Sequence, residues 1–155
     1  MKIFQHDFGG NKVSAPESWI DTTEDVESED APFTLAKKDT GVGALQFSIA
    51  LYSEGEEPNI DIAHLKEMLA DFADNKGLGE GFDECMYENR VGVVAASYHV
   101  GDDLIRVWYC SDERNIALVT YVCDWEKRGN EVKECEETVR SIQFAEETNQ
   151  SQRRS

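Results

Sequence analysis

The two residues best suited to covalent chemistry are His99 and Cys110, which fall on neighbouring strand-like segments. Residues 101–103 between these segments have the composition of a hairpin loop, so we expect the segments to pair. An imidazole beside a thiol can activate it as a nucleophile, with Tyr98 or Tyr109 as a further polar group. A reactive thiolate also needs electropositive surroundings, and this chain is strongly acidic. A small enzyme or ligand-binding domain that uses His99 and Cys110 is therefore kept as an alternative function.

The other chemical motifs are absent from the sequence. It contains no P-loop, dinucleotide fingerprint, nucleophile elbow or H-E-x-x-H motif. Residues 77–81 (GLGEG) follow a helix-like segment, so they predict a helix stop with a flexible joint and no phosphate loop. The four cysteines show no C-x-x-C spacing, and we interpret them as small buried apolar residues. The sequence therefore predicts no catalytic residue, no metal site, no cofactor and no enzymatic activity.

A dense run of acidic residues lies between positions 21 and 30. Six of these ten residues are acidic and none is basic, and like charges at this density predict an exposed loop. The run lacks the oxygen-ligand spacing of a calcium loop, so we interpret it as a solvated loop or a docking surface for a basic protein. Trp125 precedes two basic residues, and tryptophan is a frequent interface anchor. The candidate protein-binding residues are therefore Asp21, Glu24, Asp25, Glu27, Glu29, Asp30 and Trp125.

Composition limits the class of partner. The 155 residues include 15 basic and 32 acidic side chains, for a formal net charge of −17, and 40% of the residues are hydrophobic. This size predicts one domain with its own core. The negative field disfavours nucleic acid and anionic membrane surfaces and favours a basic protein partner, although solubility alone is the alternative explanation. No apolar stretch approaches a membrane span or a signal peptide, so we expect a cytoplasmic location and leave the oligomeric state open.

Periodicity predicts many strands and two helices. Apolar residues at period two or short β-rich runs predict strands over residues 2–8, 32–36, 44–52, 85–87, 91–100, 104–110 and 116–123, with 32–36 at an edge of the sheet. A stripe at helical spacing runs from Ile62 to Phe72, with a cap at Asn59 or Asp61 and a stop at Gly77. A second helix is predicted over 130–142, with its apolar stripe at Val132, Cys135, Val139 and Ile142. We expect its other face to carry Glu131, Glu134, Glu136 and Glu137.

This order of elements predicts an α+β fold, an antiparallel β-sheet flanked by helices. We expect one domain over residues 1–144 and a disordered polar tail over residues 145–155 (AEETNQSQRRS).

Five segments together resemble the Mog1/PsbP-like superfamily of small α/β sandwiches over residues 2–144. They are Pro16-Glu17-Ser18-Trp19, GALQFS at 43–48, the 62–72 helix, Thr120-Tyr121 and VRSIQF at 139–144. The resemblance implies an antiparallel sheet with helices on its faces, and members that bind other proteins without catalysis: small-GTPase regulators, photosystem subunits, secretion-effector chaperones and bacterial immunity-type proteins. No binding residue of these members is carried over to this sequence.

The resemblance and the acidity together predict a non-enzymatic, cytoplasmic protein-binding module. Its sharpest form is an immunity-type protein that neutralises a basic bacterial toxin. The alternative within the same superfamily is a chaperone for a secreted effector, for which we expect an exposed apolar groove.

Overall fold

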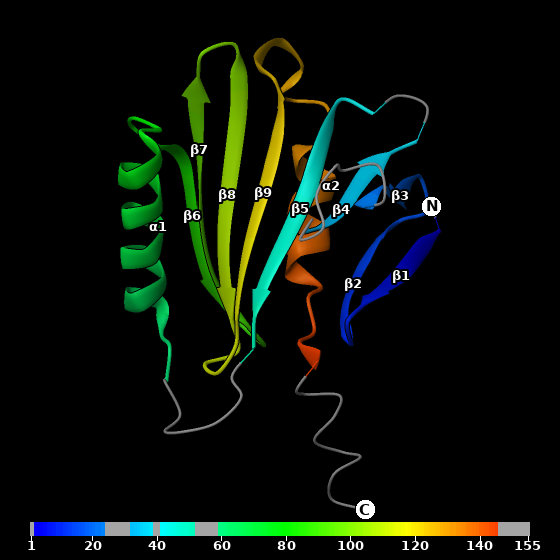
Figure 1. Ribbon diagram of the computed structural model, residues 1–155, viewed down its shortest axis with the longest axis horizontal. Coiled ribbons are helices and arrows are strands. Elements are labelled where there is room, and N and C mark those ends of the chain that lie inside the picture. Colours follow the sequence, from blue (N-terminus) through cyan, green and yellow to red (C-terminus); the bar gives the residue numbers. More distant parts are fainter. Residues whose placement is uncertain (1, 24–31, 39–40, 52–58, 146–155) are drawn as a thin grey trace, which may run out of the picture.

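The computed structural model describes residues 2–23, 32–38, 41–51 and 59–145 (Figure 1). Its main element is a seven-stranded antiparallel sheet with the strand order β3-β4-β5-β9-β8-β7-β6. The strands are β3 (Trp19–Asp21), β4 (Phe33–Lys37), β5 (Gly43–Ala50), β6 (Phe82–Glu88), β7 (Gly92–Val100), β8 (Asp103–Ser111) and β9 (Ile116–Asp124). A separate hairpin comprises β1 (Ile3–Phe8) and β2 (Asn11–Pro16). The helices are α1 (Ile62–Lys76), the short 3₁₀ helix η2 (Trp125–Lys127) and α2 (Val132–Arg140).

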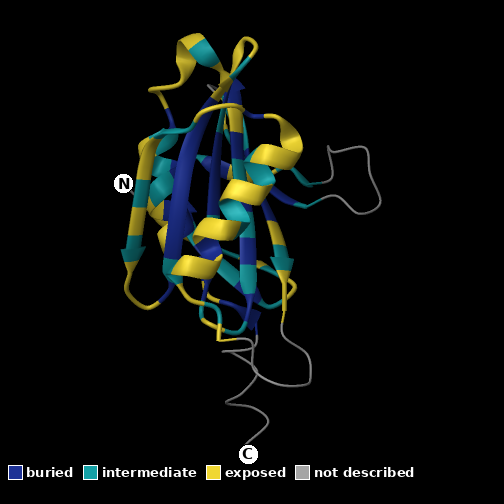
Figure 2. Ribbon diagram, turned by 90° about the vertical axis from the view of Figure 1, so that its left-hand side faces the viewer, coloured by how far each residue is buried: buried dark blue, intermediate teal, exposed yellow. Residues whose placement is uncertain are grey.

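The two helices lie on opposite faces of the sheet (Figure 1). On one side, which we call the α2 face, α2 and the β1–β2 hairpin cover a large core. On the other side, the α1 face, α1 packs over β7 and β8 above a smaller core around Tyr98 and Val107. Figure 2 shows the exposed outer surface of α1 in front of these strands. The α+β fold predicted from the sequence is confirmed.

The strand alternation predicted for β5 is present, but the position of β4 is not the predicted one. Leu45 and Phe47 are buried in the core of the α2 face, as their period-two spacing indicates. We expected residues 32–36 to be an edge strand, and this is wrong, because β3 pairs with β4 on the side away from β5. The three residues of β3 are too short to show a period in the sequence.

The ends of α1 follow their predicted signals. Asp61 caps the helix, and its Oδ1 accepts a hydrogen bond from the amide of His64 at 3.0 Å. Gly77 ends the helix in the left-handed region at a φ of 63°, where a residue without Cβ is favoured. The amide of Leu78 then donates to the carbonyl of Ala73 at 3.0 Å. The predicted helix stop within GLGEG is therefore confirmed.

Of the four glutamates that we expected on the exposed face of the second helix, Glu137 is exposed, but Glu131, Glu134 and Glu136 are not. Glu131 is 2% exposed, and it accepts hydrogen bonds from the Tyr121 hydroxyl at 2.7 Å and the Gly43 amide at 3.2 Å. Glu134 pairs with Lys37 at 2.8 Å, and Glu136 pairs with Arg106. The reason is helical spacing: Glu131 lies four residues before the buried Cys135, and Glu136 lies four after Val132, so both share the apolar face.

The described chain ends within the core. Ala145, which we assigned to the polar tail, is 3% exposed, and its amide donates to Asn11 Oδ1 at 2.9 Å. Because it is packed in this way, Ala145 lies in the folded part of the chain and not in the tail. The predicted disorder of the tail concerns residues 146–155, which lie outside the described residues.

Candidate functional site

The structure does not bring the predicted His99 and Cys110 pair together. His99 pairs with Leu104, and Cys110 pairs with Val93. Both side chains belong to the α2 face, but the six-residue offset along the strands separates them by about 20 Å. Tyr98 and Tyr109 alternate onto the opposite face and pack in the core under α1. Cys110 is fully buried, and this burial raises the pKa of its thiol, so the thiol is neutral near pH 7.

One of the six predicted acidic binding residues lies within the described part of the chain. Asp21 ends β3 at an edge of the sheet, and its Oδ1 accepts hydrogen bonds from the Thr23 amide at 2.9 Å and hydroxyl at 2.6 Å. It is exposed. The other five, Glu24, Asp25, Glu27, Glu29 and Asp30, lie outside the described residues.

Trp125, the remaining candidate, is held between two other side chains. Its ring stacks on His99 with 3.6 Å between the centroids and an interplanar angle of 4°. The guanidinium carbon of Arg128 lies 3.9 Å from the ring centroid in a cation–π contact. Phe82 contacts it edge-on at 5.8 Å. These three contacts leave the Trp125 side chain half-buried. A role for Trp125 in binding a partner protein stays a prediction.

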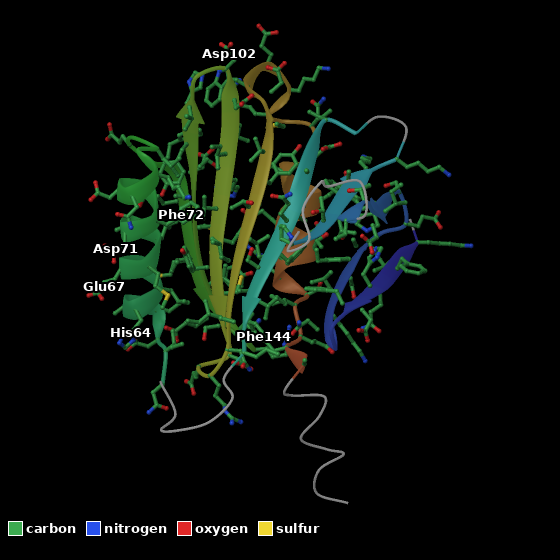
Figure 3. The ribbon with its side chains drawn as sticks, in the orientation of Figure 1. His64, Glu67, Asp71, Phe72, Asp102 and Phe144 are labelled. Atoms are coloured by element: carbon green, nitrogen blue, oxygen red, sulfur yellow. The ribbon has the colours of Figure 1, made fainter. Side chains whose placement is uncertain are left out.

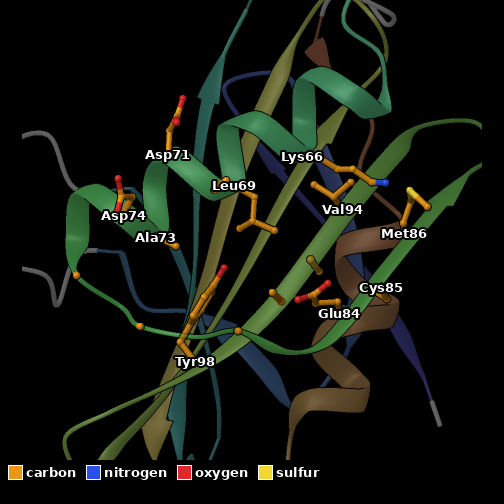
Figure 4. A pocket seen from close by; sticks show the side chains of 16 residues that line it. Lys66, Leu69, Asp71, Ala73, Asp74, Glu84, Cys85, Met86, Val94 and Tyr98 are labelled. Atoms are coloured by element: carbon orange, nitrogen blue, oxygen red, sulfur yellow. The ribbon is translucent and has the colours of Figure 1, made fainter.

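A groove with a volume of about 1250 Å³ lies on the α1 face, between α1 and the strands β6 and β7 (Figure 4). Apolar side chains line its inner part: Leu69 and Ala73 from α1, Val94, Ala96 and Tyr98 from β7, and Met86 from β6. Leu69 and Tyr98 point into the same space, whereas Asp71 and Asp74 lie at its rim. We call this concavity the α1–β6 groove.

The groove exists because α1 does not cover the edge of the sheet. α1 packs over β7 and β8, so the face of β6 beyond it stays open. Met86 on β6 is accordingly 53% exposed. The glycine-rich segment 77–81 closes one end, where Leu78 is buried and Gly81 approaches Tyr98 so closely that a Cβ would lie 3.1 Å from the ring.

The β6 wall of the groove is anchored from the opposite face of the sheet. A bulge separates Phe82 from Cys85, and Asp83 within it has a φ of 50°. The buried Arg106 donates to the Asp83 carbonyl at 3.0 Å and to Ser97 Oγ at 2.8 Å. The same guanidinium pairs with Glu136 on α2. Arg106 therefore fixes the strand that presents Glu84 and Met86 to the groove.

Exposed carboxylates surround the apolar interior of the groove. Asp71 and Asp74 lie on its α1 rim and Glu84 on its β6 rim, and among the described lining residues they face one cation, Lys66. Asp71 projects outward from α1, as does Glu67 one turn earlier (Figure 3). Burial, and secondarily the charge of Glu84, raise the pKa of Tyr98 above its ordinary value. The neutral phenol ring therefore forms part of the apolar floor at physiological pH.

The groove lining offers no activated nucleophile among the residues that the structure describes. Cys85 is a lining residue, but its thiol lies on the α2 face, where its Sγ is 3.4 Å from Arg106 Nη2. Burial, followed by the charge of Glu136, nevertheless raises the pKa of that thiol. The arrangement is suited to holding an elongated molecule with an apolar side and positive flanks.

Two further kinds of site are not found in the described parts of the chain. Within them, no three side chains of His, Cys, Asp or Glu gather in a way that could hold a metal ion. Neither of their α-helices combines the length and apolarity that a membrane crossing requires.

Sequence analysis missed the groove, although two signals for it are present. In residues 93–98 (VVAASY), the side chains on both faces of the strand are apolar or small. This pattern indicates that each face is covered by another part of the protein or binds a partner. On α1, Ala70, Ala73 and Gly77 form a row of small residues at helical spacing beside the larger stripe. Neither signal shows which part of the fold lies opposite these residues.

The comparisons with known proteins concern the fold. No family model and no curated protein matches the chain. Among solved structures, a mutant of protein Mog1 shares 11% identity and a TM-score of 0.62, over 94% of this chain and 97% of that one. The solution structure of cyanobacterial PsbP (CyanoP) from Synechocystis sp. PCC 6803 shares 10% identity and a TM-score of 0.62, over 92% of each chain.

A third structure, from Bacteroides thetaiotaomicron VPI-5482, shares 13% identity and a TM-score of 0.59. The match covers 92% of this chain and 47% of that one, so this chain spans about half its length. Identities this low establish architecture and no more. With its antiparallel sheet between α1 and α2, the chain has the Mog1/PsbP-like fold, as its sequence resemblance indicated.

Proposed function

We propose that this chain is a non-enzymatic protein-binding module, which takes a basic segment of a partner protein into the α1–β6 groove. The observation that carries the proposal is the combination of an apolar floor, around Leu69, Val94 and Tyr98, with exposed carboxylates at both rims. Apolar contacts supply affinity at the centre of such a surface, and charges at its rim select the partner and raise the association rate.

The size and shape of the groove favour a polypeptide over a small molecule. Its volume of about 1250 Å³ exceeds the range of roughly 300–1,000 Å³ that is typical of small-ligand pockets. It is also open along the exposed side of α1, where Ala70 and Asp71 are exposed. A formal net charge of −17 repels acidic partners and attracts basic ones at long range.

The sharpest form of this function is an immunity-type protein that neutralises a basic bacterial toxin in the cytoplasm. The charge supports it, because an acidic inhibitor associates rapidly with a basic active surface. The second form is a chaperone for a secreted effector, which the apolar floor of the groove favours. Both forms use the same surface and differ in what binding does to the partner.

In-cell photo-crosslinking tests the proposal while the partner is still unidentified. Benzoylphenylalanine in place of Met86 is expected to capture one protein, and the same group in place of Lys133, exposed on α2, serves as the control position. The captured protein is then purified, and its Kd for the unmodified chain is measured between low and high salt. We expect a basic partner whose affinity falls as salt rises.

A triple variant shows whether the groove is the surface that binds the partner. Asp71→Asn, Asp74→Asn and Glu84→Gln together are expected to weaken binding about tenfold. The matched control neutralises three exposed carboxylates elsewhere, Glu17→Gln, Asp102→Asn and Glu137→Gln. Equal effects of the two triples, salt-independent binding, or equal capture at both cross-linking positions would overturn the proposal.

Loss of the partner's toxic activity in the complex identifies the immunity form, and rescue of an insoluble secreted partner identifies the chaperone form.

A further inference from the structure

We infer that the occupant of the α1–β6 groove is a basic amphipathic α-helix of the partner, lying alongside α1 over β6, with its apolar side chains directed toward β7. This inference rests on the proposed function and specifies the conformation and residue pattern of the bound segment.

The spacing of the elements fits a second helix on the α1 face. Packed helices lie about 8–10 Å apart, which equals about two strand separations of 4.8 Å. Because α1 packs over β7 and β8, a neighbouring helix on the open side lies over β6 and its outer edge. The lining of α1 runs from Lys66 to Gly77, a length of about 17 Å or three helical turns. The groove therefore has the dimensions of a short helix.

The wall that α1 presents is also suited to close helix packing. Ala70, Ala73 and Gly77 lie on this side of α1 and line the groove. Small side chains on a helix let a second helix approach closely, so that its larger side chains reach the floor. Val94, Ala96 and Tyr98 form that floor. Leucine- or phenylalanine-sized residues at helical spacing on the partner would fill the space above Ala96.

The charges define the flanks of the partner helix. Asp71 and Asp74 lie on one rim and Glu84 on the other, so a bound helix meets carboxylates on both sides of its apolar stripe. Lys or Arg residues bordering that stripe on each side complement this pattern. Lys66 is the groove's own cation and opposes such a partner, which makes it a useful position for a variant.

An added β-strand fits this site less well than a helix does. β6 is an edge strand, but a bulge between Phe82 and Cys85 interrupts its register. Three of its seven residues are exposed acids: Asp83, Glu84 and Glu88. Bulges and charged side chains are the features that protect edge strands from pairing with another chain. The groove beside the edge is therefore the better binding surface.

Two synthetic peptides of about 15 residues test the inference on the full chain. In the first, Leu residues recur at helical spacing with Lys residues on both flanks; in the second, the same residues alternate with period two. Titration calorimetry and amide chemical shifts follow binding, and circular dichroism follows peptide helicity. We expect the first peptide to gain helicity and shift resonances of α1, β6 and β7, with at least about tenfold higher affinity than the second.

Variants of the chain locate the peptide. Ala70→Trp fills the groove from an exposed position and is expected to abolish binding, whereas Asn75→Trp, exposed on another side of α1, is not. Lys66→Glu is expected to tighten binding severalfold, and Lys133→Glu, with the same charge change on α2, is the control. Intact folding of each variant is verified by its amide spectrum.

Failure of the inference is distinguishable from failure of the proposed function. If Ala70→Trp abolishes binding of the cross-linked partner but neither peptide binds, or the alternating peptide binds as tightly, the groove binds protein and the occupant is not a basic amphipathic helix. If the partner binds the Ala70→Trp variant normally, the groove itself is the wrong surface and both proposals fall.

Discussion

Arg106 on β8 and Glu136 on α2 form an ion pair across the α2 face, with 2.6 Å between Arg106 Nε and Glu136 Oε1. Arg106 is 3% exposed. Glu136 also accepts a hydrogen bond from the indole nitrogen of Trp108 at 3.0 Å. Since Arg106 in turn holds the carbonyl of Asp83, the pair connects α2 to the strand that forms one wall of the groove.

Removing one member of this pair should destabilise the protein strongly. Glu136→Ala leaves the buried guanidinium without its carboxylate, which we expect to lower the free energy of unfolding by about 3–5 kcal/mol. Arg106→Met combined with Glu136→Leu should recover most of this loss, because neither charge remains buried. Urea denaturation measures each value, with the exposed Glu137→Ala as the control, expected within about 0.5 kcal/mol of the parent. A Glu136→Ala protein as stable as the parent would show that the pair contributes nothing.

The C-terminus of α1 gives a prediction about backbone conformation alone. A Cβ at Gly77 would meet no atom within 4 Å, but its φ of 63° disfavours any other residue. Gly77→Ala should therefore lower the free energy of unfolding by about 1 kcal/mol. Gly129→Ala is the matched control, because its Cβ would also be unobstructed and its φ lies outside the left-handed region. Equal effects of the two substitutions in thermal denaturation would contradict this explanation.

Stability should also fall in alkaline solution. Burial raises the pKa of the Cys110 thiol, and burial with the hydrogen bond to Glu131 raises the pKa of the Tyr121 phenol. Above pH of about 8.5 for cysteine and 10 for tyrosine, the unfolded chain loses these protons while the native chain keeps them. Each such group therefore contributes stability that is complete below those values. The loss above them is at most about 1.4 kcal/mol per pH unit per group.

Two variants assign this alkaline loss to its groups. Cys110→Ala should reduce the slope of stability against pH from about pH 8.5 upward, whereas Tyr121→Phe should reduce it from about pH 10 upward. Urea midpoints across pH 7–11 measure both slopes, and the values at pH 7 separate the packing change from the titration. Slopes identical to the parent in both variants would mean that these groups titrate alike in the folded and unfolded chains.

The parts of the fold that could be predicted are those with local signals. The alternation of Leu45 and Phe47, the Asp61 cap and the Gly77 stop each depend on a few neighbouring residues, and each is confirmed. The position of β3 depends on its pairing with β4 and carries no such signal. For α2, we expected Glu136 on the exposed face, although it lies four residues after Val132 of the apolar stripe, and its partner Arg106 is 30 residues away in the sequence.

The candidate site was harder to predict, because it depends on where elements lie relative to one another. The position of α1 over β7 and β8 leaves Met86 on β6 uncovered, and no property of residues 62–76 alone determines that position. His99 and Cys110 illustrate the opposite error. Their predicted hairpin is present, yet its register places them at opposite ends of the paired strands.

Two exposed carboxylates, Asp21 and Glu84, lie at opposite edges of the sheet, and this separation allows a comparison of the two surfaces. Asp21 is on β3 and Glu84 is on β6, the two outermost of seven strands. Six strand spacings amount to about 29 Å, well beyond the Debye length of about 8 Å at physiological salt. Charge changes at one edge should therefore leave short-range contacts at the other unaffected.

Binding kinetics with the cross-linked partner should separate the two surfaces. Neutralising Asp71, Asp74 and Glu84 in the groove is expected to raise the dissociation rate about tenfold, because bound contacts are lost. Neutralising Glu24, Asp25 and Glu27 changes the net charge equally and should alter mainly the association rate, by less than about threefold and only at low salt. If instead the second set raises the dissociation rate and the first does not, the acidic run over residues 21–30 carries the interaction and the groove is the wrong surface.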